Sequence, residues 1–241
     1  MAETGSMTDR RRQILIGLVA VLVSAVVVII WWSNRMVLPD TTSPPVHGLA
    51  FFDVGETTVL SRGLQTSLES VLGESAIEGW SPVDLSDGGH AYLPGRFPDL
   101  EALNKGLSLK DGTLAGNATW KLVFRYAKLN GLPFSHIKMV FDKKTERPLF
   151  IQARAASGQQ DFSTTLTAKF GQPAITNGPD RTLESRVWTE GENLLIASRV
   201  PNKIDVVAWH LYIYFKGNIQ ALVNRLEADA AASAVSEPSA F

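Results

Sequence analysis

A long apolar segment near the N-terminus constrains this chain more than any other feature. Residues 14–32 are nineteen nearly uninterrupted apolar residues, and Arg10, Arg11 and Arg12 stand just before them. At about 1.5 Å of rise per residue, a helix of this length spans the roughly 30 Å hydrocarbon core of a bilayer. The sequence therefore predicts a transmembrane helix at residues 14–32.

The basic residues around this helix predict its orientation. Three arginines precede it and only Arg35 closely follows it, so residues 1–13 are expected in the cytoplasm and the rest of the chain outside it. The alternative is a cleavable signal peptide, which has an apolar core of about 7 to 15 residues followed by a small-residue cleavage site. Here the longer run ends in the bulky sequence WWSNRM. We therefore predict a retained signal anchor that crosses the inner (plasma) membrane once.

The composition excludes several classes of function. The chain contains no cysteine, which removes thiol catalysis, iron–sulfur clusters, thiolate zinc sites and disulfides. From residue 36 onward there are 19 Lys and Arg against 22 Asp and Glu, a formal charge near minus three. A nucleic-acid-binding face normally appears as a basic excess, so nucleic acid is not an expected partner. The expected partners are the lipid bilayer and a membrane or envelope protein.

The exported part divides into a linker, one domain and a tail. Residues 33–47 include the proline-rich sequence VLPDTTSPP and are expected to form a linker that holds the domain away from the bilayer. Residues 48–232 are enough for one domain with its own core. Residues 233–241 are expected to be a flexible tail.

Apolar residues recur at helical spacing in four segments of this domain. In residues 61–72 the leucines lie three or four positions apart, and Gly73 is expected to end that helix. The other three helices are expected at residues 98–107, 162–170 and 218–232.

Elsewhere apolar residues alternate with polar ones, which is typical of strands with one covered face. Three successive strands are expected between residues 120 and 153, with a turn at Asn130-Gly131. An extended stretch is expected at residues 76–85, and further strands at residues 184–189, 193–199 and 204–215. The predicted fold is an α+β domain of antiparallel sheet flanked by helices.

Two segments of the chain resemble each other. When residues 67–77 are aligned with residues 165–175, Leu, Gly, Ala and Ile coincide at four offsets. Each segment would be a helix end, a glycine cap and the entry into a strand. One interpretation is a two-fold repeat of a helix-plus-sheet unit. The other is that helix ends resemble one another because glycine caps are common.

No motif for catalysis or metal binding stands out. The four histidines, His47, His90, His136 and His210, are far apart, whereas metal sites usually include a local pair of ligands. The loop at residues 84–90 could offer two aspartates and an imidazole to a cation, but a polar turn is the preferred interpretation. No Gly-x-Ser-x-Gly elbow or phosphate-binding glycine loop occurs. We therefore predict no catalytic residues, no metal site and no cofactor.

One group of basic residues has a simpler interpretation. Four basic residues gather around a predicted hairpin, with Asp142 and Glu146 among them: Lys138, Lys143, Lys144 and Arg147. Because the charges are mixed, we interpret the group as a turn in contact with solvent.

The last predicted strand carries the best candidate for a binding surface. His210, Tyr212 and Tyr214 alternate along it and would share one face, where they could stack on a partner and form hydrogen bonds with it. The alternative is that the closing helix covers this face.

These patterns predict an anchored envelope protein with an extracytoplasmic binding or scaffolding domain, an accessory subunit or assembly factor of a membrane complex rather than an enzyme. The alternative is a membrane-anchored hydrolase with dispersed catalytic residues, which a cleft joining His90 or His210 to a carboxylate and a hydroxyl would favour. A sensor is a third class, although the 13 residues before the anchor are too few for an output domain.

Overall fold

The computed structural model describes residues 48–78, 83–87, 91, 95–108, 117–125, 127, 131–156, 162–177, 184–201 and 207–236. All of these belong to one compact unit, Asp40–Phe241. The predicted anchor at residues 14–32 and the linker at residues 33–47 lie outside the described residues. Among the helices formed by the described residues, none combines the length and hydrophobicity needed to cross a bilayer.

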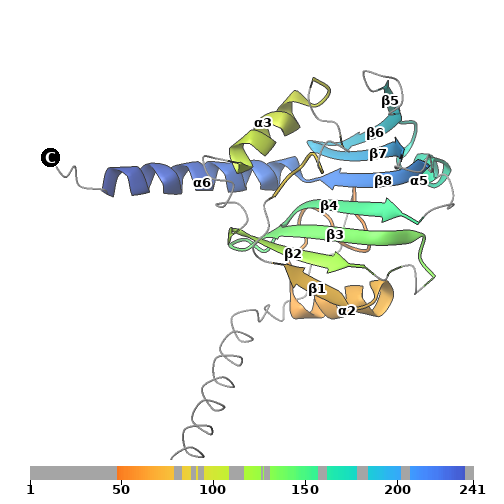
Figure 1. The fold of residues 1–241 in the computed structure, drawn as a ribbon, viewed down its shortest axis with the longest axis horizontal. Helices are drawn as coiled ribbons and strands as arrows, with labels where there is room; N and C mark the ends of the chain where they lie inside the picture. Colours follow the sequence, from red (N-terminus) through yellow and green to blue (C-terminus); the bar gives the residue numbers. More distant parts are fainter. Residues whose placement is uncertain are drawn as a thin grey trace, which may run out of the picture. The chain divides into compact units, whose positions relative to one another are not determined.

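Eight strands form one antiparallel sheet in the spatial order β1-β2-β3-β4-β8-β7-β6-β5 (Figure 1). Together with four helices in the described part of the chain, the sheet confirms the predicted α+β class. The strands are β1 (Ser75–Glu78), β2 (Thr119–Phe124), β3 (Phe134–Asp142), β4 (Pro148–Ala155), β5 (Ala174–Asn177), β6 (Glu184–Glu190), β7 (Asn193–Pro201) and β8 (Val207–Tyr214). The helices are α2 (Arg62–Leu72), α3 (Pro98–Leu107), α5 (Phe162–Phe170) and α6 (Lys216–Ser236).

The helices agree closely with the sequence. Helices α3 and α5 have the predicted bounds. Helix α2 begins after Ser61, whose hydroxyl accepts a hydrogen bond from the Leu64 N–H and so caps the helix. Helix α6 starts two residues earlier than expected and continues to Ser236, so it includes the first residues of the predicted tail.

The extended stretch predicted at residues 76–85 is confirmed only as far as Glu78, where strand β1 ends. Residues 79–82 lie outside the described part of the chain, residues 83 and 84 belong to no strand, and residues 85–87 form a turn. The cause is local, because the Asp84 carboxylate accepts hydrogen bonds from both the N–H and the hydroxyl of Ser86. An aspartate bonded in this way to the backbone two residues later favours a turn over a strand.

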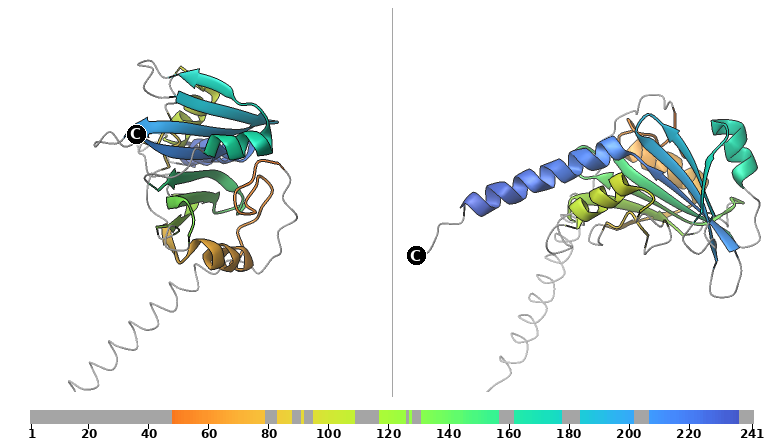
Figure 2. Two further views of the ribbon diagram at one scale, coloured as in Figure 1. Left: turned by 90° about the vertical axis from the view of Figure 1, so that its right-hand side faces the viewer. Right: turned by 90° about the horizontal axis from the view of Figure 1, so that it is seen from above.

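The helices cover both faces of the sheet (Figure 2). Helices α3 and α6 pack on one face, where their leucines join Tyr212 and Tyr214 in a buried apolar cluster. Helix α2 lies on the other face, where Gln65 donates a hydrogen bond to the Ser75 hydroxyl. Helix α5 lies on that same face, beside Ile213. We call these the α3–α6 face and the α2–α5 face.

The topology consists of two similar halves. Each half has a helix before four antiparallel strands, α2 before β1–β4 and α5 before β5–β8, and the first half also contains α3 between β1 and β2. The halves meet where β4 pairs with β8 in the middle of the sheet. Gly73 and Gly171 end the two helices with positive φ angles of 87° and 82°, a conformation in which glycine avoids the strain of a Cβ atom.

Candidate functional site

The predicted binding residues of β8 lie on the α3–α6 face and are buried. The exposed fractions of His210, Tyr212 and Tyr214 are 7%, 1% and 0%. Helix α6 covers the tyrosines, and the Tyr214 hydroxyl donates a hydrogen bond of 2.7 Å to the Leu85 carbonyl. Contact of these residues with a partner stays a prediction, and it would require the covering elements to move.

Asp87 connects the loop before α3 to β4 and β8. The Tyr212 hydroxyl donates to Asp87 Oδ2 at 3.0 Å, and His210 Nδ1 lies 3.0 Å from that hydroxyl and 3.8 Å from Asp87 Oδ2. Gln152 and Arg154 also donate to the same carboxylate. We call these five residues the Asp87 network. It holds residues 83–87 against the sheet.

The charges of the Asp87 network follow from these contacts. Burial alone would raise the pKa of Asp87, but His210, Arg154 and Gln152 together hold it well below its usual value. Burial and the charge of Asp87 raise the pKa of Tyr212 far above that of an ordinary tyrosine. At neutral pH the network therefore contains a carboxylate and a protonated phenol.

This geometry bears on the hydrolase alternative. His210 does meet a carboxylate and a hydroxyl, as that alternative expects. However, Tyr212 is buried and its phenol holds its proton, so it is poorly suited to attack a substrate. The arrangement fits a structural network better than a catalytic one.

The loop at residues 84–90 is described only as far as Asp87, and His90 lies outside the described residues. Asp84 accepts hydrogen bonds from Ser86 and from the Asn104 side chain, as in a polar turn. Within the described ranges, no three His, Asp or Glu side chains are grouped closely enough to hold a metal ion.

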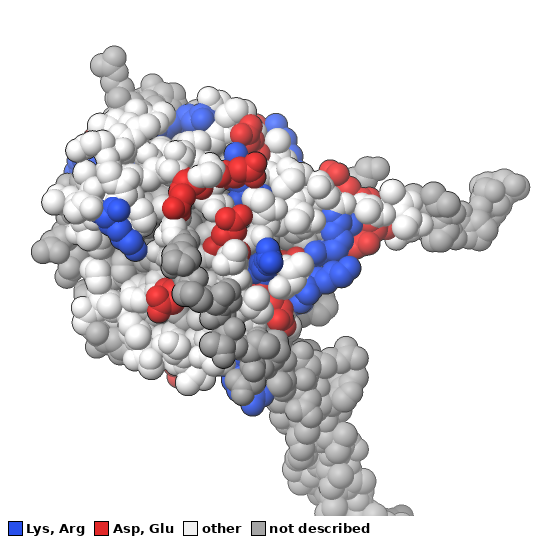
Figure 3. Space-filling model, turned by 180° about the vertical axis from the view of Figure 1, so that it is seen from behind, with Lys and Arg blue, Asp and Glu red and all other residues white. Residues whose placement is uncertain are grey.

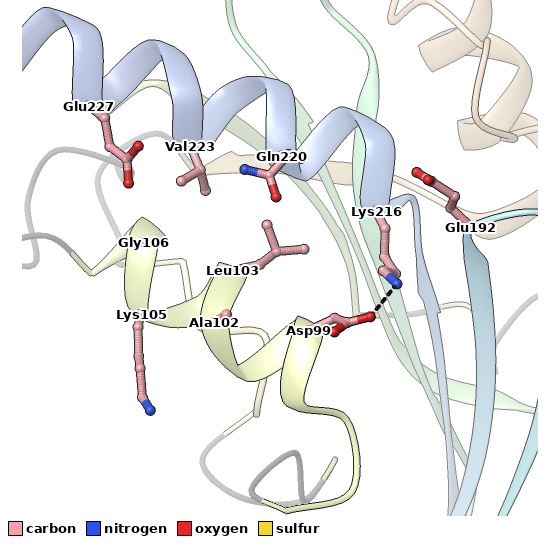
Figure 4. Close-up of a pocket in the computed structure, with 10 residues that line it drawn as sticks. All are labelled: Asp99, Ala102, Leu103, Lys105, Gly106, Glu192, Lys216, Gln220, Val223 and Glu227. Atoms are coloured by element: carbon pink, nitrogen blue, oxygen red, sulfur yellow. Dashed lines mark hydrogen bonds and ion pairs between the residues drawn. The ribbon is translucent and has the colours of Figure 1, made fainter.

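A cleft of about 680 Å³ separates α3 from α6 at the surface (Figure 4). Leu103 and Val223 point toward one another across it, and Lys216 pairs with Asp99 at 3.1 Å. The helices approach closely at Gly106, where an added Cβ atom would lie 2.6 Å from Val223 Cγ1. We call this hollow the α3–α6 cleft.

Charged groups surround the α3–α6 cleft. Glu192 and Glu227 stand at its opposite ends in Figure 4. Neither forms an ion pair with a described residue, whereas Lys105 is paired with Glu101 at 2.9 Å. On the molecular face drawn in Figure 3, acidic and basic side chains are interspersed. The carboxylates of Glu192 and Glu227 make the ends of the cleft acidic.

A smaller apolar pocket lies on the α2–α5 face. It has a volume of about 310 Å³ and lies between α5 and the Phe51–Phe52 turn. Phe134 stacks on Phe162 with ring centroids 5.3 Å apart in its wall. The pocket offers apolar contacts and little else.

In comparisons with protein-family models, curated proteins and solved structures, the chain matches none of them. The site is therefore assigned on geometry alone. Sequence reasoning did not find the α3–α6 cleft, although it placed both helices that form it. The one signal was Gly106 within a helix rich in leucine, because an internal glycine often marks a close approach.

Proposed function

We propose that this chain is a single-pass protein of the cell envelope whose extracytoplasmic domain binds a membrane or envelope protein and scaffolds it within a complex. The α3–α6 cleft is the observation that carries this proposal. It is a surface hollow of about 680 Å³ between two helices, which is a common geometry for receiving a partner segment.

The chemistry of the cleft favours a basic amphipathic helix as the partner segment. Ala102, Leu103 and Val223 supply an apolar floor, and Glu192 and Glu227 supply negative charge at the ends. A helix whose apolar face lies on the floor could place Lys or Arg side chains near both carboxylates. Residues 14–32, as a membrane anchor, would keep the cleft close to membrane partners and raise its effective concentration there.

We propose binding rather than catalysis because the α3–α6 cleft is open to a partner, whereas the residues that most resemble catalytic machinery are not. Tyr212 and His210, the pair that most resembles catalytic machinery, are buried in the Asp87 network. At His210, the hydrolase alternative would require these buried groups to become accessible.

Site-specific photo-crosslinking in intact membranes tests the proposal. A photoreactive amino acid replaces the exposed Gln220 in the middle of the cleft, and a control carries it at the exposed Ser67 on α2. The tagged full-length protein is irradiated, extracted in mild detergent and purified with its adducts. We expect a stoichiometric membrane or envelope protein attached at Gln220 and absent from the Ser67 control.

Reversing the charge of Glu192 tests whether the acidic end of the cleft contributes to partner binding. Glu192→Lys should reduce recovery of that partner several-fold, because it places a like charge beside a basic segment. Glu74→Lys makes the same change at an exposed position before β1 and should leave recovery unchanged. Recovery of the protein alone, or equal crosslinking from Gln220 and Ser67, would contradict the proposal and make a hydrolase screen the next step.

We further propose that the two halves of the domain arose by duplication of a helix-plus-four-strand unit. The matched topology and the two glycine-capped helix ends support this. An experimental structure in which α2 and α5 cross their four strands in the same direction would strengthen the proposal. Different crossing directions would argue against it.

A further inference from the structure

A polar hollow of about 260 Å³ lies on the α3–α6 face over three neighbouring strands, β2, β3 and β4. Alternate residues of these strands point to the same side, and the register places Val123 beside Lys138 and Lys138 beside Gln152. We call the hollow the basic cavity. Its polar wall contains four basic side chains against two carboxylates: Lys121, Arg125, Lys138 and Arg154 against Glu78 and Asp84, together with His136 and Gln152.

Three polar atoms of this wall are buried without a hydrogen-bond partner among the described residues. They are His136 Nδ1, Gln152 Oε1 and Arg154 Nε. Buried polar atoms in folded proteins nearly always have partners, so three in one cavity indicate that something else binds there.

The orientation of the Gln152 amide is fixed by its neighbour. The deprotonated Asp87 carboxylate only accepts hydrogen bonds, so the NH₂ group of Gln152 must face it. Gln152 Oε1, on a side chain that is 0% exposed, therefore needs a donor. Arg154 Nε needs an acceptor. An occupant that satisfies both must accept and donate hydrogen bonds.

The charges of the cavity also point to an occupant. Arg125 pairs with Glu78 at 2.9 Å, and Arg154 pairs with Asp87 at 3.2 Å. Lys138 is half-buried in the wall and forms no ion pair with a described residue. A partly buried ammonium is stabilised by a nearby anion.

The pKa values reflect the same crowding of cations. Burial, followed by the charge of Lys138, lowers the pKa of Lys121 to about 8. Burial also lowers the pKa of Lys138, although Asp87 opposes the change. Burial and the charge of Arg154 lower the pKa of His136 to about 4, so its imidazole is neutral at pH 7. A bound anion would raise all three.

We propose that the basic cavity binds a protonated phosphate group, as the free ion or as the monoester headgroup of a lipid. Its oxygens would accept hydrogen bonds from Arg154 and Lys138, while its P–OH group would donate to Gln152 Oε1. Sulfate has a similar shape but carries no proton at neutral pH, so it cannot make the last bond. This site is separate from the proposed partner site, because none of its residues lines the α3–α6 cleft.

Calorimetric titration of the full-length protein in non-ionic detergent at low salt tests this assignment. The probes are inorganic phosphate and, as the matched ion without a donor, sulfate. We expect phosphate to bind at least ten-fold more tightly than sulfate. Addition of dihexanoyl phosphatidic acid then separates the two sources, since displacement of phosphate indicates a lipid headgroup and no displacement indicates the free ion.

Two variants and a control connect binding to the cavity. Lys138→Met should weaken phosphate binding ten-fold or more, and Gln152→Met should remove the preference over sulfate. Lys105→Met removes the same charge from a side chain that is 76% exposed on α3 and should bind as the wild type does. Folding of each variant is checked by circular dichroism. Absence of saturable phosphate binding, equal affinity for sulfate, or unchanged binding by folded Lys138→Met would overturn the proposal.

Discussion

The close approach of α3 and α6 makes a quantitative prediction about Gly106 and Val223. In an isolated helix, Gly106→Ala would stabilise by about 1 kcal/mol through helix propensity. Here the new Cβ atom would lie 2.6 Å from Val223 Cγ1 and 3.2 Å from Cγ2, and overpacking of this kind costs about 1 to 3 kcal/mol. We therefore expect a net destabilisation of about 1 kcal/mol.

The partner substitution supplies the second side of a double-mutant cycle. Val223 is 4% exposed, so Val223→Ala removes two buried methyl groups. Their loss from the core costs about 1.6 kcal/mol of transfer free energy, and the cavity left behind brings the expected destabilisation to about 2 to 3 kcal/mol. In the double variant the methyl group introduced by Gly106→Ala occupies the vacated space, and the gain in helix propensity remains. We expect the double variant to lose only about 1 kcal/mol, a favourable coupling of about 2 kcal/mol.

Urea unfolding of the full-length protein in detergent, followed by tryptophan fluorescence, measures each free energy. Gly217→Ala is the matched control in the first turn of α6, where the added Cβ atom meets only ordinary contacts, the nearest at 3.4 Å. It should be neutral or mildly stabilising. If Gly106→Ala behaves like this control and its effect adds to that of Val223→Ala, the helices do not approach as described.

Two further predictions concern an ion pair and the anchor. Arg225→Met removes hydrogen bonds of 2.6 and 2.9 Å from the buried Asp142 and should cost about 3 kcal/mol near pH 7 in urea unfolding. Burial would raise the pKa of Asp142, but the hydrogen bonds from Arg225 lower it below its ordinary value of 3.8. The stabilisation is therefore present above pH 3.8 and is lost as the pH falls through the lowered pKa. A wild-type advantage over Arg225→Met that persists in strong acid would contradict the assignment. Leu18→Arg places a charge in the predicted transmembrane helix at a cost of about 2.5 to 3.5 kcal/mol and should reduce carbonate-resistant membrane integration relative to Leu18→Val. Full integration of the Arg variant would refute the placement of the anchor.

The elements of this fold were predictable because their patterns are local. The leucine stripe of α3 and the glycine after α5 are each visible within about ten residues, and both helices have the predicted bounds. The pairing of β4 with β8 had no such signal, because their contact depends on how the halves meet. The polar turn expected at residues 84–90 agrees with the described residues 85–87, but the extended stretch before it was predicted to run too far, because the bonding of Asp84 overrides an extended pattern.

The basic cavity was missed for a different reason. Lys138 was interpreted as part of a solvated turn because other charged residues follow it in the sequence. The register instead places it on β3, between Val123 of β2 and Gln152 of β4. Alternation predicted the polar face of these strands but not that the face would be enclosed. That outcome depends on residues far away in the sequence, including Asp84.

The β4–β8 junction affects the order in which the domain can be completed. Phe150 of β4 pairs with Tyr214 of β8, so the hydrogen bonds that join the two halves cannot form until β8 has been added. Until β8 arrives, β4 has an open edge whose N–H and C=O groups can pair with another chain. Contacts so distant in sequence also form slowly. A newly made chain therefore passes through a stage that is prone to aggregation, and strand β8 ends that stage by closing the centre of the sheet.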